Sequence, residues 1–124
     1  MRILPLFTTL IAFAATDTPR GDPAPGPIAE IVSYRLKPGI SIEAAVLAAQ
    51  GTEAFLRETG AVISRTLSRD DNGVWTDFIL WTSLQAAKET EANAMQRPEF
   101  ARFFAMMAET SVELRYARVM MQMD

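Results

Sequence analysis

The chain has 124 residues, which is the length of a single domain. With 49% hydrophobic and 22% charged residues, its composition is that of a globular protein and excludes a largely disordered chain. The net charge of −3 and the lack of a basic run argue against nucleic acid as a partner.

The sequence contains neither cysteine nor histidine, and this limits the kinds of catalytic and metal site that the chain can form. The sequence has no cysteine, which excludes disulfides and thiolate nucleophiles. It also has no histidine, the residue that most often acts as a general base near neutral pH and that most often binds metal ions. Any catalysis therefore has to use carboxylates, hydroxyls, Tyr, Trp, Lys or Arg. We expect neither a metal site nor a cofactor.

Residues 1–15, MRILPLFTTLIAFAA, have the pattern of a signal peptide. Arg2 precedes an apolar run that ends with the small-x-small sequence Ala12-Phe13-Ala14, and the run is shorter than the roughly 20 residues of a membrane span. We expect an exported protein, periplasmic or secreted, with no stable membrane anchor after cleavage. Pro5 interrupts the apolar run, so a cytoplasmic protein with an irregular N-terminus is the alternative.

Residues 16–27, TDTPRGDPAPGP, predict a linker, because four prolines and two glycines in this stretch remove backbone donors and bury little. The folded domain is therefore expected at residues 28–124. A domain of this size has a small core, which favours pairing with a second copy.

The domain reads as alternating strands and helices. IAEIVSYRL (28–36) predicts a strand, and Ser41 is a candidate N-cap for a helix over 42–58 that ends before Gly60. AVISRTLSR (61–69) and VWTDFILW (74–81) predict two strands joined by the turn DDNG, in which Asn-Gly accepts positive φ angles.

A second helix follows Thr82 or Ser83, and Pro98 begins a new helical segment. This segment carries Phe100, Phe103, Phe104 and Met107 at the spacing of a buried face. SVELRYARVMMQ (111–122) predicts the last strand. The order βαββαβ predicts an α+β, ferredoxin-like fold, with a four-stranded antiparallel sheet and helices on one face.

The strand at 74–81 has two different faces. Val74, Thr76, Phe78 and Leu80 form the more uniformly apolar set, which we expect beneath the helices. The other set combines Trp75, Asp77, Ile79 and Trp81, a mixture that suits a semi-enclosed cavity. We expect the sheet of a second subunit to cover this second set.

The chain resembles the antibiotic biosynthesis monooxygenases (ABM proteins) of the dimeric α/β-barrel superfamily. The resemblance covers residues 28 to about 122 and is carried by the element order and by the segments IVSYRLKPG, ILWTSLQAAKE and RPEFARFF. It implies a homodimer with a pocket between the sheet and the helices or loops at its edge. Several proteins of this family are oxygenases that use neither metal nor flavin, and others degrade haem.

In the haem-degrading branch of this family, a tryptophan at the position of Trp81 lines the pocket. The other functional residues of that branch do not carry over, because its asparagine falls at Tyr34 and its histidine near Glu91. The resemblance therefore does not imply haem degradation.

Asp77 and Glu30 are the candidate catalytic residues. Their strands are neighbours in this topology, and two partly buried carboxylates raise at least one pKa, which makes a proton acceptor near neutral pH. The alternative is that each carboxylate pairs with an arginine, for which Arg35, Arg65 and Arg115 are available. The facing of Glu30 is less clear, because the first strand alternates poorly.

Trp81, Tyr34, Trp75 and Ile79 are the candidate ligand-binding residues. Trp81 either forms a pocket wall that stacks on a flat ligand or closes the barrel end, and Tyr34 either donates to a ligand oxygen or is a core tyrosine. For Trp75 the alternative, a hairpin aromatic without a ligand, is the more common role of such a residue. Five methionines near the C-terminus, at 106, 107, 120, 121 and 123, suit packing better than soft copper. The segment KETE (88–91) suits a solvated helix face.

These features predict a dimeric protein that binds a small, flat, largely apolar molecule. The alternative is a cofactor-independent monooxygenase in which Asp77 or Glu30 removes a proton from a phenolic or quinol-type aromatic.

Overall fold

A computed structural model describes residues 26–123, as one sheet with helices on one face. The four strands are β1 (Ile28–Tyr34), β2 (Val62–Arg69), β3 (Trp75–Trp81) and β4 (Glu113–Arg118). The predicted signal peptide, and the predicted linker up to residue 25, lie outside the described residues.

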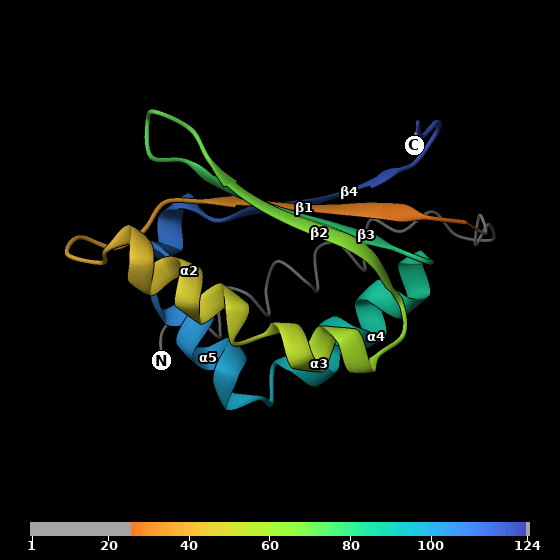
Figure 1. Ribbon diagram of the computed structural model, residues 1–124, viewed down its shortest axis with the longest axis horizontal. Coiled ribbons are helices and arrows are strands. Elements are labelled where there is room, and N and C mark those ends of the chain that lie inside the picture. Colours follow the sequence, from red (N-terminus) through yellow and green to blue (C-terminus); the bar gives the residue numbers. More distant parts are fainter. Residues whose placement is uncertain (1–25, 124) are drawn as a thin grey trace.

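All pairings in the sheet are antiparallel, in the order β2-β3-β1-β4. The helices are α2 (Ile42–Gln50), α3 (Glu53–Glu58), α4 (Leu84–Ala94) and α5 (Pro98–Ala105), with a short 3-10 turn at Glu109–Ser111. Figure 1 shows all four helices on one side of the sheet. The predicted ferredoxin-like fold is confirmed.

The helix predicted over 42–58 is interrupted at Gly51 and Thr52. Ser41 caps its first part, because its hydroxyl accepts from the backbone N–H of Ala44. At the break, the carbonyl of Ala49 accepts three hydrogen bonds that do not belong to a regular α-helix. The donors are the N–H of Thr52 (3.1 Å), the Thr52 hydroxyl (2.6 Å) and Arg65 (3.2 Å). The prediction of one continuous helix was wrong because side chains compete for this carbonyl.

The prediction for the second helical region is confirmed. Ser83 caps α4 by accepting from the N–H of Ala86, and Pro98 occupies the first turn of α5. The predicted apolar face of α5 is buried beneath the sheet: Phe100, Phe103, Phe104 and Met107 are 1–7% exposed. These four side chains form the centre of the core with Tyr34, Trp75 and Trp81.

The turn between β2 and β3 has one residue with positive φ, Gly73 at 85°. Asp70 holds the turn, because its Oδ1 accepts from the backbone N–H groups of Asn72 and Val74, both at 2.9 Å. The predicted turn is therefore present, but Asn72 does not share the positive φ that an Asn-Gly turn was expected to show.

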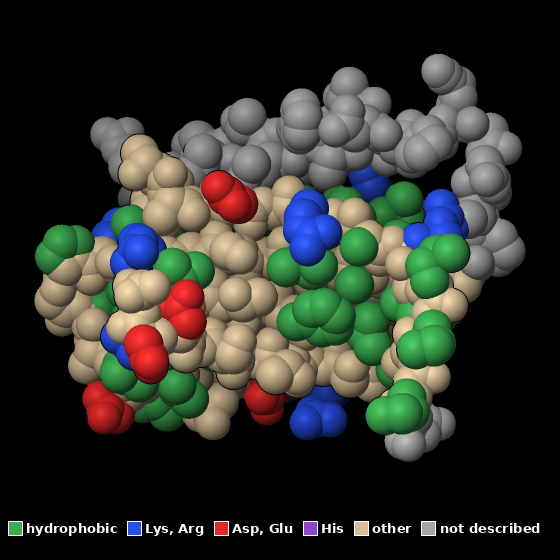
Figure 2. Space-filling model, turned by 90° about the horizontal axis from the view of Figure 1, so that it is seen from above, with side chains coloured by type: hydrophobic (Ala, Val, Ile, Leu, Met, Phe, Trp, Pro, Cys, Tyr) green, Lys and Arg blue, Asp and Glu red, His purple; other side chains and the backbone are tan. Residues whose placement is uncertain are grey.

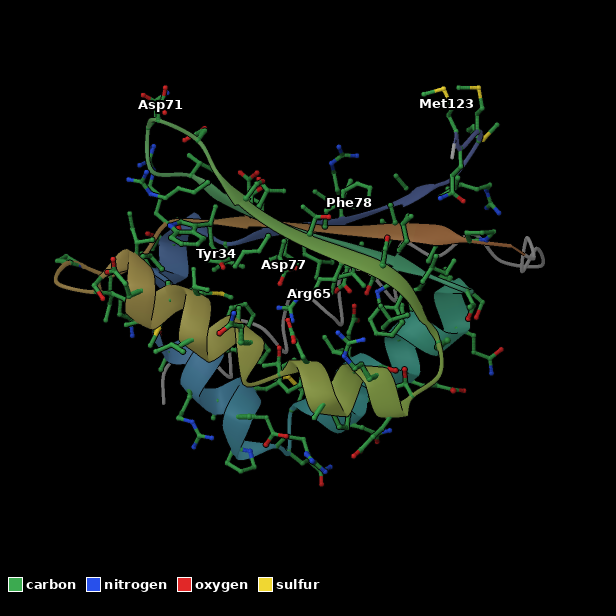
Figure 3. All side chains as sticks on the ribbon, viewed as in Figure 1. Tyr34, Arg65, Asp71, Asp77, Phe78 and Met123 are labelled. Carbon is green, nitrogen blue, oxygen red and sulfur yellow. The ribbon has the colours of Figure 1, made fainter. Side chains whose placement is uncertain are left out.

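The predicted facing of β3 was wrong. Trp75, Asp77, Ile79 and Trp81 lie on the helix-covered side, at 1–7% exposure, while Phe78 points away from the helices and is 37% exposed (Figure 3). The two sets of residues that share a face of β3 were predicted correctly, but the prediction placed each set on the wrong side of the sheet. Asp77 is tolerated beneath the helices because Arg65 neutralises it.

The two ends of the described domain lie next to each other, because the first strand pairs with the last. β1 and β4 are paired, with Ile28 opposite Arg118, and the N–H of Val119 donates to the carbonyl of Pro27 at 3.3 Å. Within residues 26–123, the helices are too short or too polar to cross a membrane.

Candidate functional site

A small chamber of about 40 Å³ lies between the sheet and its helices. Four of the predicted site residues line it, Glu30, Asp77, Ile79 and Trp81, and the three phenylalanines of α5 form its apolar wall. This volume holds about two or three water molecules, so it does not admit an aromatic ring in its present form. The chamber is enclosed by the protein's own helices, which corrects the expectation that a second subunit covers these residues.

Glu30 occupies the centre of β1 on the helix side. It is 4% exposed, and its Oε1 accepts from the indole Nε1–H of Trp81 at 2.8 Å. Trp81 is only 1% exposed, so its indole both fills the core and positions the Glu30 carboxyl group. Trp81 therefore occupies a core position that also borders the chamber, and its role as a wall for a ligand stays a prediction.

A second buried carboxylate, Glu91 of α4, lies beside Glu30. Glu91 is 5% exposed and its Oε2 accepts from the hydroxyl of Tyr116. Burial, together with the hydrogen bond and the charge of Glu91, raises the pKa of Glu30 well above its ordinary value, against the opposing effect of the Trp81 hydrogen bond. The Glu30 carboxyl group therefore keeps its proton to a higher pH than an exposed glutamate does.

Tyr116 shares the apolar environment of this carboxyl pair. Burial and the charges of Glu30 and Glu91 raise the pKa of its hydroxyl, so it stays a hydrogen-bond donor at every physiological pH. Lys88 Nζ lies 5.4 Å from the centre of the Tyr116 ring and adds positive charge on this side.

Asp77 makes a two-point ion pair with Arg65 of β2. Arg65 donates from Nε to Oδ1 at 2.9 Å and from a terminal nitrogen to Oδ2 at 2.7 Å. Its other terminal nitrogen donates to the Thr52 hydroxyl at 2.8 Å, and Figure 3 shows Arg65 and Asp77 in the space beneath the sheet. Burial lowers the pKa of Arg65, but the hydrogen bond and charge of Asp77 outweigh this and raise it.

This pairing was the alternative that the sequence left open for Asp77. It gives Asp77 the geometry of a structural residue, because both of its oxygens are held by one guanidinium group. A proton acceptor in the chamber therefore has to be sought in the Glu30–Glu91 pair.

Tyr34 and Trp75 lie away from the chamber. Their rings are stacked at 6.3 Å between centres, and the Phe103 ring packs edge-on against Tyr34 at 6.1 Å. Both residues are 2–3% exposed. Burial and the charge of Asp77 raise the pKa of Tyr34. Their position is that of core aromatics beside the site.

A larger groove opens between the edge strand β2 and the helices α2 and α3. It has a volume of about 490 Å³, within the range of roughly 300–1,000 Å³ that is typical of small-molecule sites. Its apolar wall consists of Val46, Leu56, Val62, Ile63 and Leu67, and its polar residues include Gln50, Glu53 and Arg57. Leu56 and Arg65 line both the groove and the chamber, and so form the boundary between them.

The acidic residues between positions 26 and 123 form no group of three or more that is placed to hold a metal ion. The predicted methionine group is also divided: Met107 is 1% exposed in the core, whereas Met120, Met121 and Met123 are 84–91% exposed.

Comparison with solved structures agrees with this architecture. A protein assigned to the antibiotic biosynthesis monooxygenases from Caulobacter crescentus superposes with a TM-score of 0.65 at 16% identity, over 78% of this chain and 92% of that protein. SnoaB, a cofactor-independent oxygenase from Streptomyces nogalater, gives a TM-score of 0.62 at 12% identity, over 78% and 96% of the two chains.

The chain has the ABM-like fold. A NIPSNAP-family protein of unknown function from Agrobacterium tumefaciens shares it, with a TM-score of 0.57 at 20% identity over 77% of this chain and 90% of that one. No protein-family model and no functionally curated protein matches the sequence. The fold therefore has oxygenases and proteins without a known reaction among its representatives.

Three residues of the site were not predicted from the sequence: Glu91, Tyr116 and Thr52. Glu91 was assigned with Thr90 to a solvated helix face, which was wrong, since they are 5% and 7% exposed. A signal was present, because positions 87, 90, 91 and 94 follow the spacing of one buried helix face. Glu91 lies on the same stripe as Ala87 and Ala94.

Proposed function

We propose that the protein binds a small, flat, largely apolar molecule in the groove between β2 and the helices α2 and α3. The groove itself carries this proposal: it is large enough for such a molecule, whereas the chamber is not. Its apolar wall would hold the ring system, and Leu56 and Arg65 would separate the ligand from the chamber. No reaction is required for this function.

A matched pair of variants on α2 tests the site. Val46 lines the groove, and the neighbouring Leu47 is 66% exposed and does not. Val46→Trp should fill the groove and weaken binding of 2-naphthol by about tenfold or more, which corresponds to about 1.4 kcal/mol. Leu47→Trp, with the same new side chain one position away, should bind as the wild type does. Equal binding by both variants in titration calorimetry would place the ligand elsewhere.

A second candidate function is cofactor-independent oxygenation of a phenolic or quinol-type aromatic. It is supported by the fold shared with SnoaB and by a buried carboxyl pair next to Trp81. Oxygen uptake with an anthrone or a quinol tests it. A rate that is unchanged when Glu30→Gln is combined with Asp77→Asn would exclude the acid–base role of these residues.

We also propose that the protein is exported and that it forms a homodimer through the sheet face opposite the helices. Ile31, Phe78 and Leu80 of the two central strands belong to this face by their register. Figure 2, which looks onto this side, shows hydrophobic side chains gathered there with basic side chains between them. Pairing of two such faces would remove apolar surface from water, which supports a small domain.

A further inference from the structure

Three methionines near the C-terminal end of the chain are exposed, although the fold of the domain gives them no role there. β4 ends at Arg118, and residues 119–123, which we name the C-terminal tail, belong to no helix or strand. Met120, Met121 and Met123 are 84–91% exposed, and none of them belongs to the core. Apolar side chains gain free energy when they leave water, so three of them grouped in water indicate a role other than the folding of this domain.

The C-terminal tail lies on the outer side of the molecule. Figure 1 shows it above the sheet, on the side away from the helices, and Figure 3 shows Met123 at its end, far from the chamber. The other methionines of this region are different, because Met107 is part of the core and Met106 packs against it. The packing that the sequence favoured for the whole methionine group is therefore seen for Met106 and Met107 and not for the tail.

The tail carries a distinct set of metal donors. Thioether sulfur is a soft and uncharged ligand that suits Cu(I), whereas Zn²⁺ and Cu²⁺ are commonly held by imidazole, thiolate or carboxylate groups. The chain has no cysteine and no histidine, and the acidic residues between positions 26 and 123 form no group placed to hold a metal. Among the described residues, the exposed donors gathered in one place are thus the soft sulfur atoms of the tail.

We propose that Met120, Met121 and Met123 form a binding site for one Cu(I) ion. Residues two positions apart on an extended chain are roughly 7 Å apart and point to the same side, so the sulfur atoms of Met121 and Met123 can approach one ion. Methionine has three rotatable bonds, and no regular structure restrains the tail, which allows Met120 to supply a third sulfur. The site is separate from the groove and the chamber, so this inference goes beyond the proposed ligand-binding function and does not depend on it.

Titration calorimetry of the full chain with silver nitrate, in a buffer without chloride, tests the proposal. Ag(I) has the charge of Cu(I) and the same preference for thioethers, but it does not need protection from air. The wild type should bind one Ag(I) per chain. Replacing Met120, Met121 and Met123 together by Leu keeps the apolar volume but removes the sulfur, and should weaken binding by about tenfold or more. Met95→Leu combined with Met106→Leu changes two methionines that pack against the core, and should bind as the wild type does.

Two further measurements identify the ligands. Thioethers carry no proton to lose, so the affinity should be the same at about pH 5 and about pH 7, whereas a carboxylate site would weaken in acid. In NMR spectra of protein with labelled methionine methyl groups, the tail signals should shift with Ag(I), while that of Met107, which is 1% exposed, should not.

The same experiments can overturn the proposal. It fails if the wild type does not bind Ag(I), if the triple leucine variant binds it as tightly as the wild type, or if the Met95 and Met106 variant loses as much affinity as the triple variant. Packing of the tail against a second subunit is distinguished as well, because leucine would preserve packing and a tail used only for packing would bind no metal.

Discussion

Both carboxylate oxygens of Asp77 accept hydrogen bonds from Arg65, so one ion pair joins the two strands of the hairpin beneath the helices. The side chains are only 13% and 5% exposed, which separates this pair from the surface pair of Arg97 and Glu99. The same guanidinium also reaches the carbonyl of Ala49 and the hydroxyl of Thr52, at the break between α2 and α3. Arg65 therefore connects the edge strand, the central sheet and two helices.

Replacing one partner of this pair should destabilise the protein strongly. Arg65→Met leaves Asp77 as a buried, unpaired charge, which costs about 3–5 kcal/mol of unfolding free energy. Combining it with Asp77→Leu should recover part of this loss, because no buried charge then remains. Urea unfolding measures both. Glu99→Gln, which breaks the exposed pair, should have a far smaller effect, and an equally small effect of Arg65→Met would contradict the structural role of the buried pair.

Thr52 should contribute to the stability of the fold through the hydrogen bonds of its hydroxyl group and not through the volume of its side chain. Thr52→Val keeps the shape but removes the group that donates to Ala49 and accepts from Arg65, both of which stay buried. We expect a loss of about 1–3 kcal/mol in thermal or urea unfolding. Thr66→Val, on the exposed part of β2, should change stability by less than about 0.5 kcal/mol.

The stability of the protein should fall with rising pH because of Glu30. Its pKa is raised in the folded state, so the folded protein holds this proton more tightly than the unfolded chain does. The stabilisation is complete below pH 4.5, the ordinary pKa of glutamate, and is lost as the pH rises through the higher folded value. Glu30→Gln imitates the protonated form and should flatten this part of the curve.

Glu99 gives a control of opposite sign for the pH experiment. Its hydrogen bond to the backbone, with help from Arg97, lowers its pKa, so any contribution it makes is present at higher pH and is lost as the pH falls. Glu99→Gln should therefore leave the decline above pH 4.5 unchanged. A wild-type curve that rises above pH 4.5 and is unaffected by Glu30→Gln would contradict the protonation of the carboxyl pair.

The proposed dimer should depend on Phe78. Phe78→Glu places a charge on the sheet face opposite the helices and should convert a dimer into a monomer in sedimentation at micromolar concentration. Thr66→Glu, opposite Phe78 on the edge strand, tests whether the interface extends to β2. A wild-type protein that sediments as a monomer would end the dimer proposal.

Much of this fold was predictable because its signals are local. The serine caps, the Gly73 turn, the proline at the start of α5 and the phenylalanine spacing each determine an element through nearby residues. The side of the sheet on which Asp77 lies was not predictable in the same way. Both faces of β3 carry large apolar side chains, and the buried carboxylate of Asp77 is tolerable because Arg65 on the neighbouring strand pairs with it, one of three arginines that the sequence left open as its partner.

The same limit applies to the site. Glu30 was identified from its strand, but its partner Glu91 is 61 positions further along the chain and reads as part of a charged helix segment. Only the packing of α4 on the sheet brings the two carboxyl groups and Tyr116 together. The alternation of β1 was also hard to interpret, since Glu30 and Tyr34 are polar residues on the buried side.

The hydrogen bond between Val119 and Pro27 has a practical consequence for engineering. Because the start of β1 lies next to the end of β4, a short peptide can join residues 119 and 27 without crossing the sheet. New chain termini can then be opened in the exposed DDNG turn, which would give a circularly permuted protein with an unchanged core.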